Sequence, residues 1–218
     1  MENKAKKPLE LYIHVPFCVK KCDYCDFLSG PAGKERQAEY FQALQREVAS
    51  VPDFPDREIT TVFIGGGTPS VPDPALIGAV LDQIRNKFFM APDAEITIEA
   101  NPGTLYKEKL EDYLEHGVNR LSLGLQSPQN RELKILGRIH TWEEFLESFS
   151  LAREAGFSNI NIDLMSAIPD QTYEDWKKNL CTVAALGPEH ISAYSLIVEE
   201  GTPFRERDLK LPDEDTEY

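Results

Sequence analysis

The chain has 218 residues, with 37 Asp and Glu against 23 Lys and Arg, so its formal net charge is −14. This acidity argues against nucleic-acid binding, whose affinity comes largely from Lys and Arg side chains that neutralise phosphates. No stretch approaches the roughly 18 continuous apolar residues of a membrane-spanning helix, and the charged residues 1–10 lack the apolar centre of a secretory signal. We therefore expect a cytoplasmic protein that neither spans a membrane nor binds nucleic acid.

Strand and helix patterns alternate along the chain. In chain order we expect a strand at 11–17, a helix at 34–51, a strand at 59–64, a helix at 76–88, a strand at 95–99, a helix at 107–116, a strand at 120–125, helices at 129–136 and 142–155, a strand at 159–165, a helix at 173–185 and a strand at 190–196. Gly117 and Gly156 follow two of these helices and are expected to end them. Cys181, in the last helix, is expected to be a small core residue.

Alternating strands and helices predict a parallel sheet covered by helices and joined by right-handed crossovers. Six strand–helix units fall short of the eight units and ~250 residues of a closed barrel. We therefore predict an α/β fold, a partial (β/α)6 barrel of the TIM type. The expected core spans 11–204, preceded by a short extension at 1–10 and followed by a charged tail at 205–218, which we expect to be cut before a further domain.

Three cysteines follow the first predicted strand at C-x3-C-x2-C spacing: Cys18, Cys22 and Cys25. Three thiolates on one loop indicate a metal site. A structural zinc site uses four protein ligands, and ferredoxin clusters use four cysteines at other spacings, whereas a cubane cluster held by three cysteines leaves one iron open to a small molecule. A zinc site completed by His14, or a trio of buried structural cysteines, remains the alternative.

Unusual polar and glycine residues lie where the other strands end. They are the Gly65–Thr68 loop, Glu99, Asn101, Gln126 and Asp163. The carboxyl ends of parallel barrel strands share one rim, where ligands bind, and glycines allow a backbone to approach a ligand closely. The glycine loop lacks the Lys-Ser/Thr pair of a phosphate loop.

The chemistry of these side chains suits a nucleoside and an amino acid. Glu99 ends a strand that the sheet should bury, and a buried carboxylate is unfavourable without a partner, so we expect it to meet a ligand hydroxyl or ammonium unless it points to solvent. Arg138 could bind a carboxylate bidentately, or could be an exposed residue at a helix end. Gln126 and Asp163 could bind ribose hydroxyls.

The cysteine spacing, with an aromatic residue before the last cysteine, resembles the radical S-adenosylmethionine (SAM) superfamily. Six motifs in order resemble, more narrowly, the oxygen-independent coproporphyrinogen III oxidase family. They span residues 12–18, 64–70, 97–103, 119–127, 136–140 and 188–196. The resemblance implies a [4Fe-4S] cluster on Cys18, Cys22 and Cys25. It also implies SAM contacts from Tyr12, Tyr24, Gly66, Gly67, Thr68, Glu99, Gln126, Arg138 and Asp163.

Within this family, the chain resembles the heme chaperone branch. The true oxidase has a fourth cysteine where this chain has Phe27, and an N-terminal arm where this chain has about ten residues. The branch implies heme or porphyrin as a ligand, heme-accepting hemoproteins as partners, and an electron donor such as flavodoxin or ferredoxin. Heme is also a candidate cofactor.

Two alternative functions remain open. The first is a radical enzyme that oxidatively decarboxylates coproporphyrinogen III, so the sequence does not decide whether the chain is an enzyme. The second is a non-catalytic metal-bound module. Members of the chaperone branch carry an H-N-x-x-Y-W motif in a C-terminal region that we expect to be missing after Tyr218.

Overall fold

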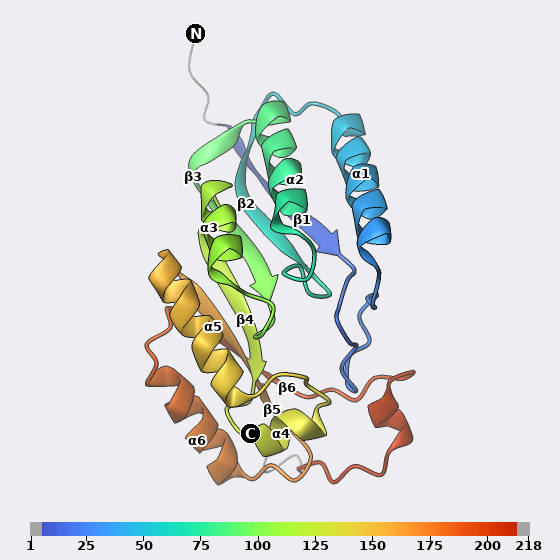
Figure 1. The fold of residues 1–218 in the computed structure, drawn as a ribbon, viewed down its shortest axis with the longest axis vertical. Helices are drawn as coiled ribbons and strands as arrows, with labels where there is room; N and C mark the ends of the chain where they lie inside the picture. Colours follow the sequence, from blue (N-terminus) through green and yellow to red (C-terminus); the bar gives the residue numbers. More distant parts are fainter. Residues whose placement is uncertain (1–5, 213–218) are drawn as a thin grey trace.

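The computed structural model describes residues 6–212, and strands alternate with helices along that span (Figure 1). The strands are β1 (Lys7–Val15), β2 (Arg57–Gly66), β3 (Met90–Ala100), β4 (Arg120–Gln126), β5 (Ile160–Ser166) and β6 (His190–Ser195). The helices are α1 (Lys34–Ser50), α2 (Pro74–Lys87), α3 (Lys107–Glu115), α4 (Asn130–Ile135), α5 (Trp142–Ala155) and α6 (Tyr173–Ala184), with a short 3-10 helix, η1 (Pro203–Glu206).

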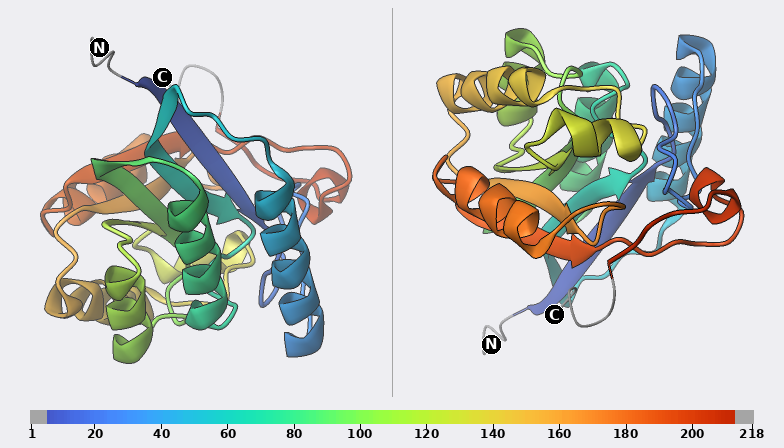
Figure 2. Two further views of the ribbon diagram at one scale, coloured as in Figure 1. Left: turned by 90° about the horizontal axis from the view of Figure 1, so that it is seen from above. Right: turned by 90° about the horizontal axis from the view of Figure 1, so that it is seen from below.

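The strands form one parallel sheet in the order β1-β2-β3-β4-β5-β6, so each strand pairs with its neighbours in sequence. Figure 2 shows that the sheet curves and that the long helices lie around its outside. Each crossover helix covers an apolar strand face, which is how a parallel sheet is buried. The predicted partial (β/α)6 barrel is confirmed.

The main differences from the predicted elements lie at strand beginnings. β1 begins at Lys7, paired with Arg57 of β2, so part of the expected N-terminal extension is strand. β3 begins at Met90 and includes a proline, Pro92. Sequence patterns missed these edges because the charged and proline residues there are poor strand formers.

The predicted tail, 205–218, lies partly outside the described residues, which end at 212. Its described part contacts the core. Helix η1 continues past residue 204, the Arg207 guanidinium donates to Asp23 Oδ2 at 2.7 Å, and the Asp170 N–H donates to the Lys210 carbonyl. These contacts join the segment after β6 to the cysteine loop and to the β5–α6 loop.

Local signals account for several helix ends. Thr141 and Glu144 form a reciprocal capping box at the start of α5, and Gly156 ends that helix with φ of 116°. Gly117 follows α3 with φ of 76°. Glycine is favoured at both positions because a Cβ disfavours this left-handed region, so the two predicted glycine stops are confirmed.

The main core lies between the sheet and its outer helices. Strand residues that face these helices are fully buried in every strand but the last; they include Val15, Ile64, Ile98, Leu123 and Ile162. A smaller cluster near the carboxyl ends contains Leu136, Met165, Ile168, Leu196 and Phe204.

The prediction that Cys181 is a core residue is wrong, because its side chain is exposed. The buried residues of α6 are Asn179 and Val183. Cys181 lies two positions from each of them, and on a helix of 3.6 residues per turn this separation turns its side chain to a different face. None of the helices within residues 6–212 combines the length and the apolarity needed to cross a membrane.

Candidate cofactor-binding site

The carboxyl ends of the strands open into one pocket with a cavity volume of about 320 Å³, within the usual range for small-molecule sites. Every predicted site residue except Tyr12 lines it. These residues are Cys18, Cys22, Cys25, Tyr24, Gly66, Gly67, Thr68, Glu99, Gln126, Arg138 and Asp163. They come together because parallel strands end at one rim.

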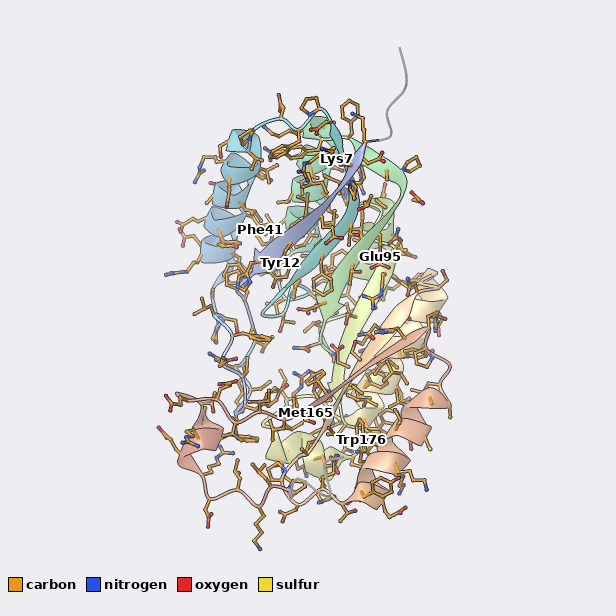
Figure 3. All side chains as sticks on the ribbon, turned by 180° about the vertical axis from the view of Figure 1, so that it is seen from behind. Lys7, Tyr12, Phe41, Glu95, Met165 and Trp176 are labelled. Carbon is orange, nitrogen blue, oxygen red and sulfur yellow. The ribbon has the colours of Figure 1, made fainter. Side chains whose placement is uncertain are left out.

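Tyr12 lies outside this lining. Its residue surface is 60% exposed, its ring stacks on Phe63 with centroids 6.1 Å apart, and its hydroxyl lies 3.3 Å from His14 Nδ1. Figure 3 shows Tyr12 partway along β1, whereas Met165, which lines the pocket, lies near the carboxyl end of β5. The structure therefore does not place Tyr12 with the other predicted contacts.

The cysteine loop is anchored to the barrel at its base. The Cys18 N–H donates to the Gly30 carbonyl, the Gly30 N–H donates to the Pro16 carbonyl, and the Thr68 N–H donates to the Phe17 carbonyl. The loop is therefore held at both ends and joined to the glycine loop after β2.

The three thiols share the pocket wall, and burial raises the pKa of Cys25, with the charges of Cys22 and Cys18 adding to the rise. Among residues 6–212, no three His, Cys, Asp or Glu side chains are gathered closely enough to hold a metal ion. The assignment of the three cysteines as cluster ligands therefore stays a prediction.

Contacts within the protein explain in part why residues 66 and 67 of the glycine loop are glycines. Gly66 has φ of 114°, and a Cβ there would lie 2.6 Å from the His14 ring. A Cβ on Gly67 would lie 2.7 Å from the Phe17 carbonyl oxygen. A side chain at either position would collide with β1 or the cysteine loop, so these glycines bring the three segments together whether or not a ligand is bound.

Glu99 is a mostly buried carboxyl group at the end of β3. Its Oε2 accepts a hydrogen bond from the Gly66 N–H at 3.1 Å. Burial raises the pKa of Glu99 to about 7, and the negative charge of Asp163 raises it further, while the Gly66 hydrogen bond opposes the rise. A buried acid that titrates near neutrality inside a pocket is typical of a functional site.

Gln126, at the end of β4, and Asp163, on β5, also line the pocket. Asp163 accepts hydrogen bonds from Asn161 Nδ2 at 2.7 Å and from Ser122 Oγ at 3.4 Å. Burial raises the pKa of Asp163 although these hydrogen bonds oppose it. Gln126 has φ of 74°, rare for a residue with a Cβ, and its Oε1 accepts from the Tyr194 hydroxyl at 2.6 Å.

Arg138 points into the protein, so the alternative of an exposed helix-end arginine is wrong. Its Nη2 donates to Asn101 Oδ1 at 2.7 Å and to the Gly124 carbonyl at 2.5 Å. Its Nη1 donates to Cys22 Sγ at 3.5 Å. The guanidinium thus faces a predicted cluster ligand.

The site also contains residues that the sequence did not assign. Asn101 and Tyr194 line the pocket and hydrogen-bond to predicted contacts, and the exposed Phe27 lies at its mouth. The sequence could have identified Asn101 as a site residue, since it follows β3 at the rim. It could not have identified Tyr194, because an aromatic residue near the end of a strand is ordinary.

The radical SAM superfamily model matches residues 12–180 of the chain. Among curated relatives, the heme chaperone HemW of Escherichia coli strain K12 is 43% identical over 210 residues, covering 95% of this chain and 56% of the relative. HemW of Bacillus subtilis strain 168 is 40% identical over 195 residues, covering 88% and 52%. The chain thus spans about half the length of these relatives.

Solved structures share the fold. Coproporphyrinogen III oxidase (HemN) from Escherichia coli, described as a radical SAM enzyme, superposes with a TM-score of 0.87 at 30% identity, covering 99% of this chain and 51% of that one. Streptococcus suis SuiB bound to S-adenosylmethionine superposes with a TM-score of 0.61 at 18% identity, covering 96% and 44%. The second likeness concerns the fold alone.

Proposed function

The chain belongs to the radical SAM superfamily, and from this membership we propose that it is the radical SAM core of a heme chaperone. The superfamily's cofactors are a [4Fe-4S] cluster and S-adenosylmethionine. When bound, they supply one-electron chemistry. The chain's own residues would hold the two groups and limit the access of water.

The residues at the pocket fit these cofactors chemically. Cys18, Cys22 and Cys25 offer thiol ligands from one anchored loop, and three ligands leave one iron for SAM. Backbone groups of the Gly66–Thr68 loop lie beside that wall. We propose that this loop and Glu99 hold the amino-acid end of SAM.

Further pocket residues offer groups for the rest of SAM. Gln126 and Asp163 would bind its ribose, and Tyr24 would line the site beside the cluster loop. Arg138 carries the positive charge that a carboxylate needs, although in this structure its donors contact protein groups. Tyr12 would take part only if its exposed side chain moved toward the pocket.

The observation that carries the chaperone assignment is the match to HemW, together with Phe27 where the oxidase has a cysteine. Phe27 is 62% exposed at the pocket mouth and offers no thiol. We propose that heme, delivered to hemoproteins, is the cargo, and that flavodoxin or ferredoxin reduces the cluster. A reducing compartment, the cytoplasm, would suit the free thiols.

The second candidate is oxidative decarboxylation of coproporphyrinogen III, which the close superposition on HemN favours. The two candidates differ in what they do with SAM. An oxidase releases 5′-deoxyadenosine only when the porphyrinogen is supplied, whereas a chaperone binds heme and passes it to an apo-hemoprotein.

The first experiment is electron paramagnetic resonance of anaerobically reconstituted, dithionite-reduced protein, with and without SAM. A [4Fe-4S]+ signal that changes on SAM addition is expected. The signal should be lost in Cys22→Ser and kept in Cys181→Ser, the matched control, because Cys181 is an exposed thiol on α6. A signal indifferent to SAM would contradict the pocket assignment, and zinc in place of iron would favour the non-catalytic metal module.

Heme handling is tested separately. Heme titration followed by absorbance, then transfer to an apo-hemoprotein, should succeed with the reconstituted protein. Formation of 5′-deoxyadenosine that depends on added coproporphyrinogen III would instead establish the oxidase.

A further inference from the structure

A continuous hydrogen-bonded path joins two of the predicted cluster cysteines through Asn101. Thr68 Oγ1 lies 3.6 Å from Cys18 Sγ and accepts from Asn101 Nδ2 at 2.9 Å. On the other side, Asn101 Oδ1 accepts from Arg138 Nη2 at 2.7 Å, and Arg138 Nη1 donates to Cys22 Sγ at 3.5 Å. The path therefore begins and ends at a sulfur.

Donor and acceptor rules determine the direction of each bond in this path. Arg138 carries only donors, so its partner on Asn101 must be the amide oxygen. The amide nitrogen of Asn101, Nδ2, then faces Thr68 and donates to its hydroxyl oxygen. The Thr68 hydroxyl, already accepting, has its own proton free to donate to Cys18. Asn101 thus orients two donors, each toward a different sulfur.

The surroundings hold Asn101 in place. Its N–H donates to Ser70 Oγ at 3.3 Å, and its carbonyl accepts from Thr104 Oγ1 at 2.6 Å. Gly124, in the middle of β4, makes room, because a Cβ there would lie 2.7 Å from Asn101 Oδ1. Glycine inside a strand commonly marks such a close approach.

We propose that Asn101 is a positioning residue that sets the reduction potential of the cluster by fixing the sulfur-directed donors of Thr68 and Arg138. This inference rests on the proposed function, since it takes Cys18 and Cys22 as cluster ligands. Hydrogen bonds to the sulfurs are one determinant of cluster potentials. Reduction adds negative charge, so donors and a nearby guanidinium favour the reduced state and raise the potential.

The test is a potentiometric titration of the anaerobically reconstituted full chain without SAM, followed by the [4Fe-4S]+ resonance. Asn101→Leu removes both links of the path at similar volume and should shift the midpoint to more negative potential. Thr68→Val removes one donor to sulfur and should also shift the midpoint to more negative potential. Thr68→Ser keeps the hydroxyl and should keep the wild-type midpoint. Asn86→Leu, on an exposed position of α2, is the matched control and should not shift it.

Asn101 acts partly through Thr68, so the double variant Asn101→Leu/Thr68→Val should shift the midpoint by less than the sum of the single shifts. Iron and sulfide contents equal to wild type ensure that the same cluster is compared. Equal midpoints in Asn101→Leu and Asn86→Leu, or equal midpoints in Thr68→Val and Thr68→Ser, would overturn the inference. Absence of any cluster signal in the wild type would overturn the proposed function as well.

Discussion

Replacing Glu99 with glutamine should stabilise the cofactor-free protein above neutral pH. The pKa of Glu99 is raised from its ordinary 4.5 to about 7, chiefly because the carboxyl group is buried. The folded protein therefore holds this proton over a pH range in which the unfolded chain has released it. Stability from Glu99 is fully present below pH 4.5 and is lost as the pH rises through about 7.

The size of this loss follows from the shift. Each pKa unit corresponds to about 1.4 kcal/mol, so the charged carboxylate lowers the free energy of unfolding by roughly 3 kcal/mol at pH 8. The substituted glutamine would not titrate, and its amide oxygen can still accept from the Gly66 N–H. Glu99→Gln should therefore resemble wild type near pH 4 and exceed its free energy of unfolding by roughly 3 kcal/mol at pH 8.

The assay is urea unfolding of the cofactor-free protein between pH 4 and pH 8. Glu95→Gln on the same strand is the control, because that side chain is exposed and should leave the wild-type pH profile unchanged. Parallel profiles for wild type and Glu99→Gln would refute the burial argument. The variant should also bind SAM more weakly. The Glu99 carboxylate, which is unfavourable in the cofactor-free protein, is the group that we propose holds the amino-acid end of SAM.

Three shorter predictions concern residues that stabilise the fold around the pocket. Gly66→Ala should unfold at lower urea and lose SAM binding measured by equilibrium dialysis, because its Cβ would meet the His14 ring at a positive φ; unchanged stability would contradict the close contact. Thr141→Ala, which removes the α5 capping box, should lower the free energy of unfolding by about 1 kcal/mol in urea, with Thr182→Ala in α6 as control. Glu132 is fully buried and accepts hydrogen bonds from Ser127, Gln171 and Asn179. Glu132→Ala should lower the free energy of unfolding in the same assay by about 3 kcal/mol or more, because these donors lose their partner. A smaller loss would mean that water replaces the carboxylate.

The pattern of elements could be predicted from sequence because it depends on neighbouring residues. Apolar periodicity located each strand and helix, and glycine located two helix ends, as in Gly156 after α5. Since parallel strands end at one rim, the same pattern also predicted that residues as distant as Cys18 and Asp163 would share a pocket.

Side-chain direction and long-range partners depended on tertiary structure. Arg138 bonds to a sulfur 116 positions away and to an amide 37 positions away, and no local pattern encodes either choice. Tyr12 belongs to a motif of the site yet lies outside the pocket, and Cys181 proved exposed.

The chain by itself therefore determined the elements, their order and the rim at which its chemistry gathers, since these follow from periodicity and from the geometry of parallel strands. Only the packed structure decided which donors face which acceptors there. Such pairings, like the bridge of Asn101 between Thr68 and Arg138, form once burial removes competing water and leaves each polar group the partners within its reach.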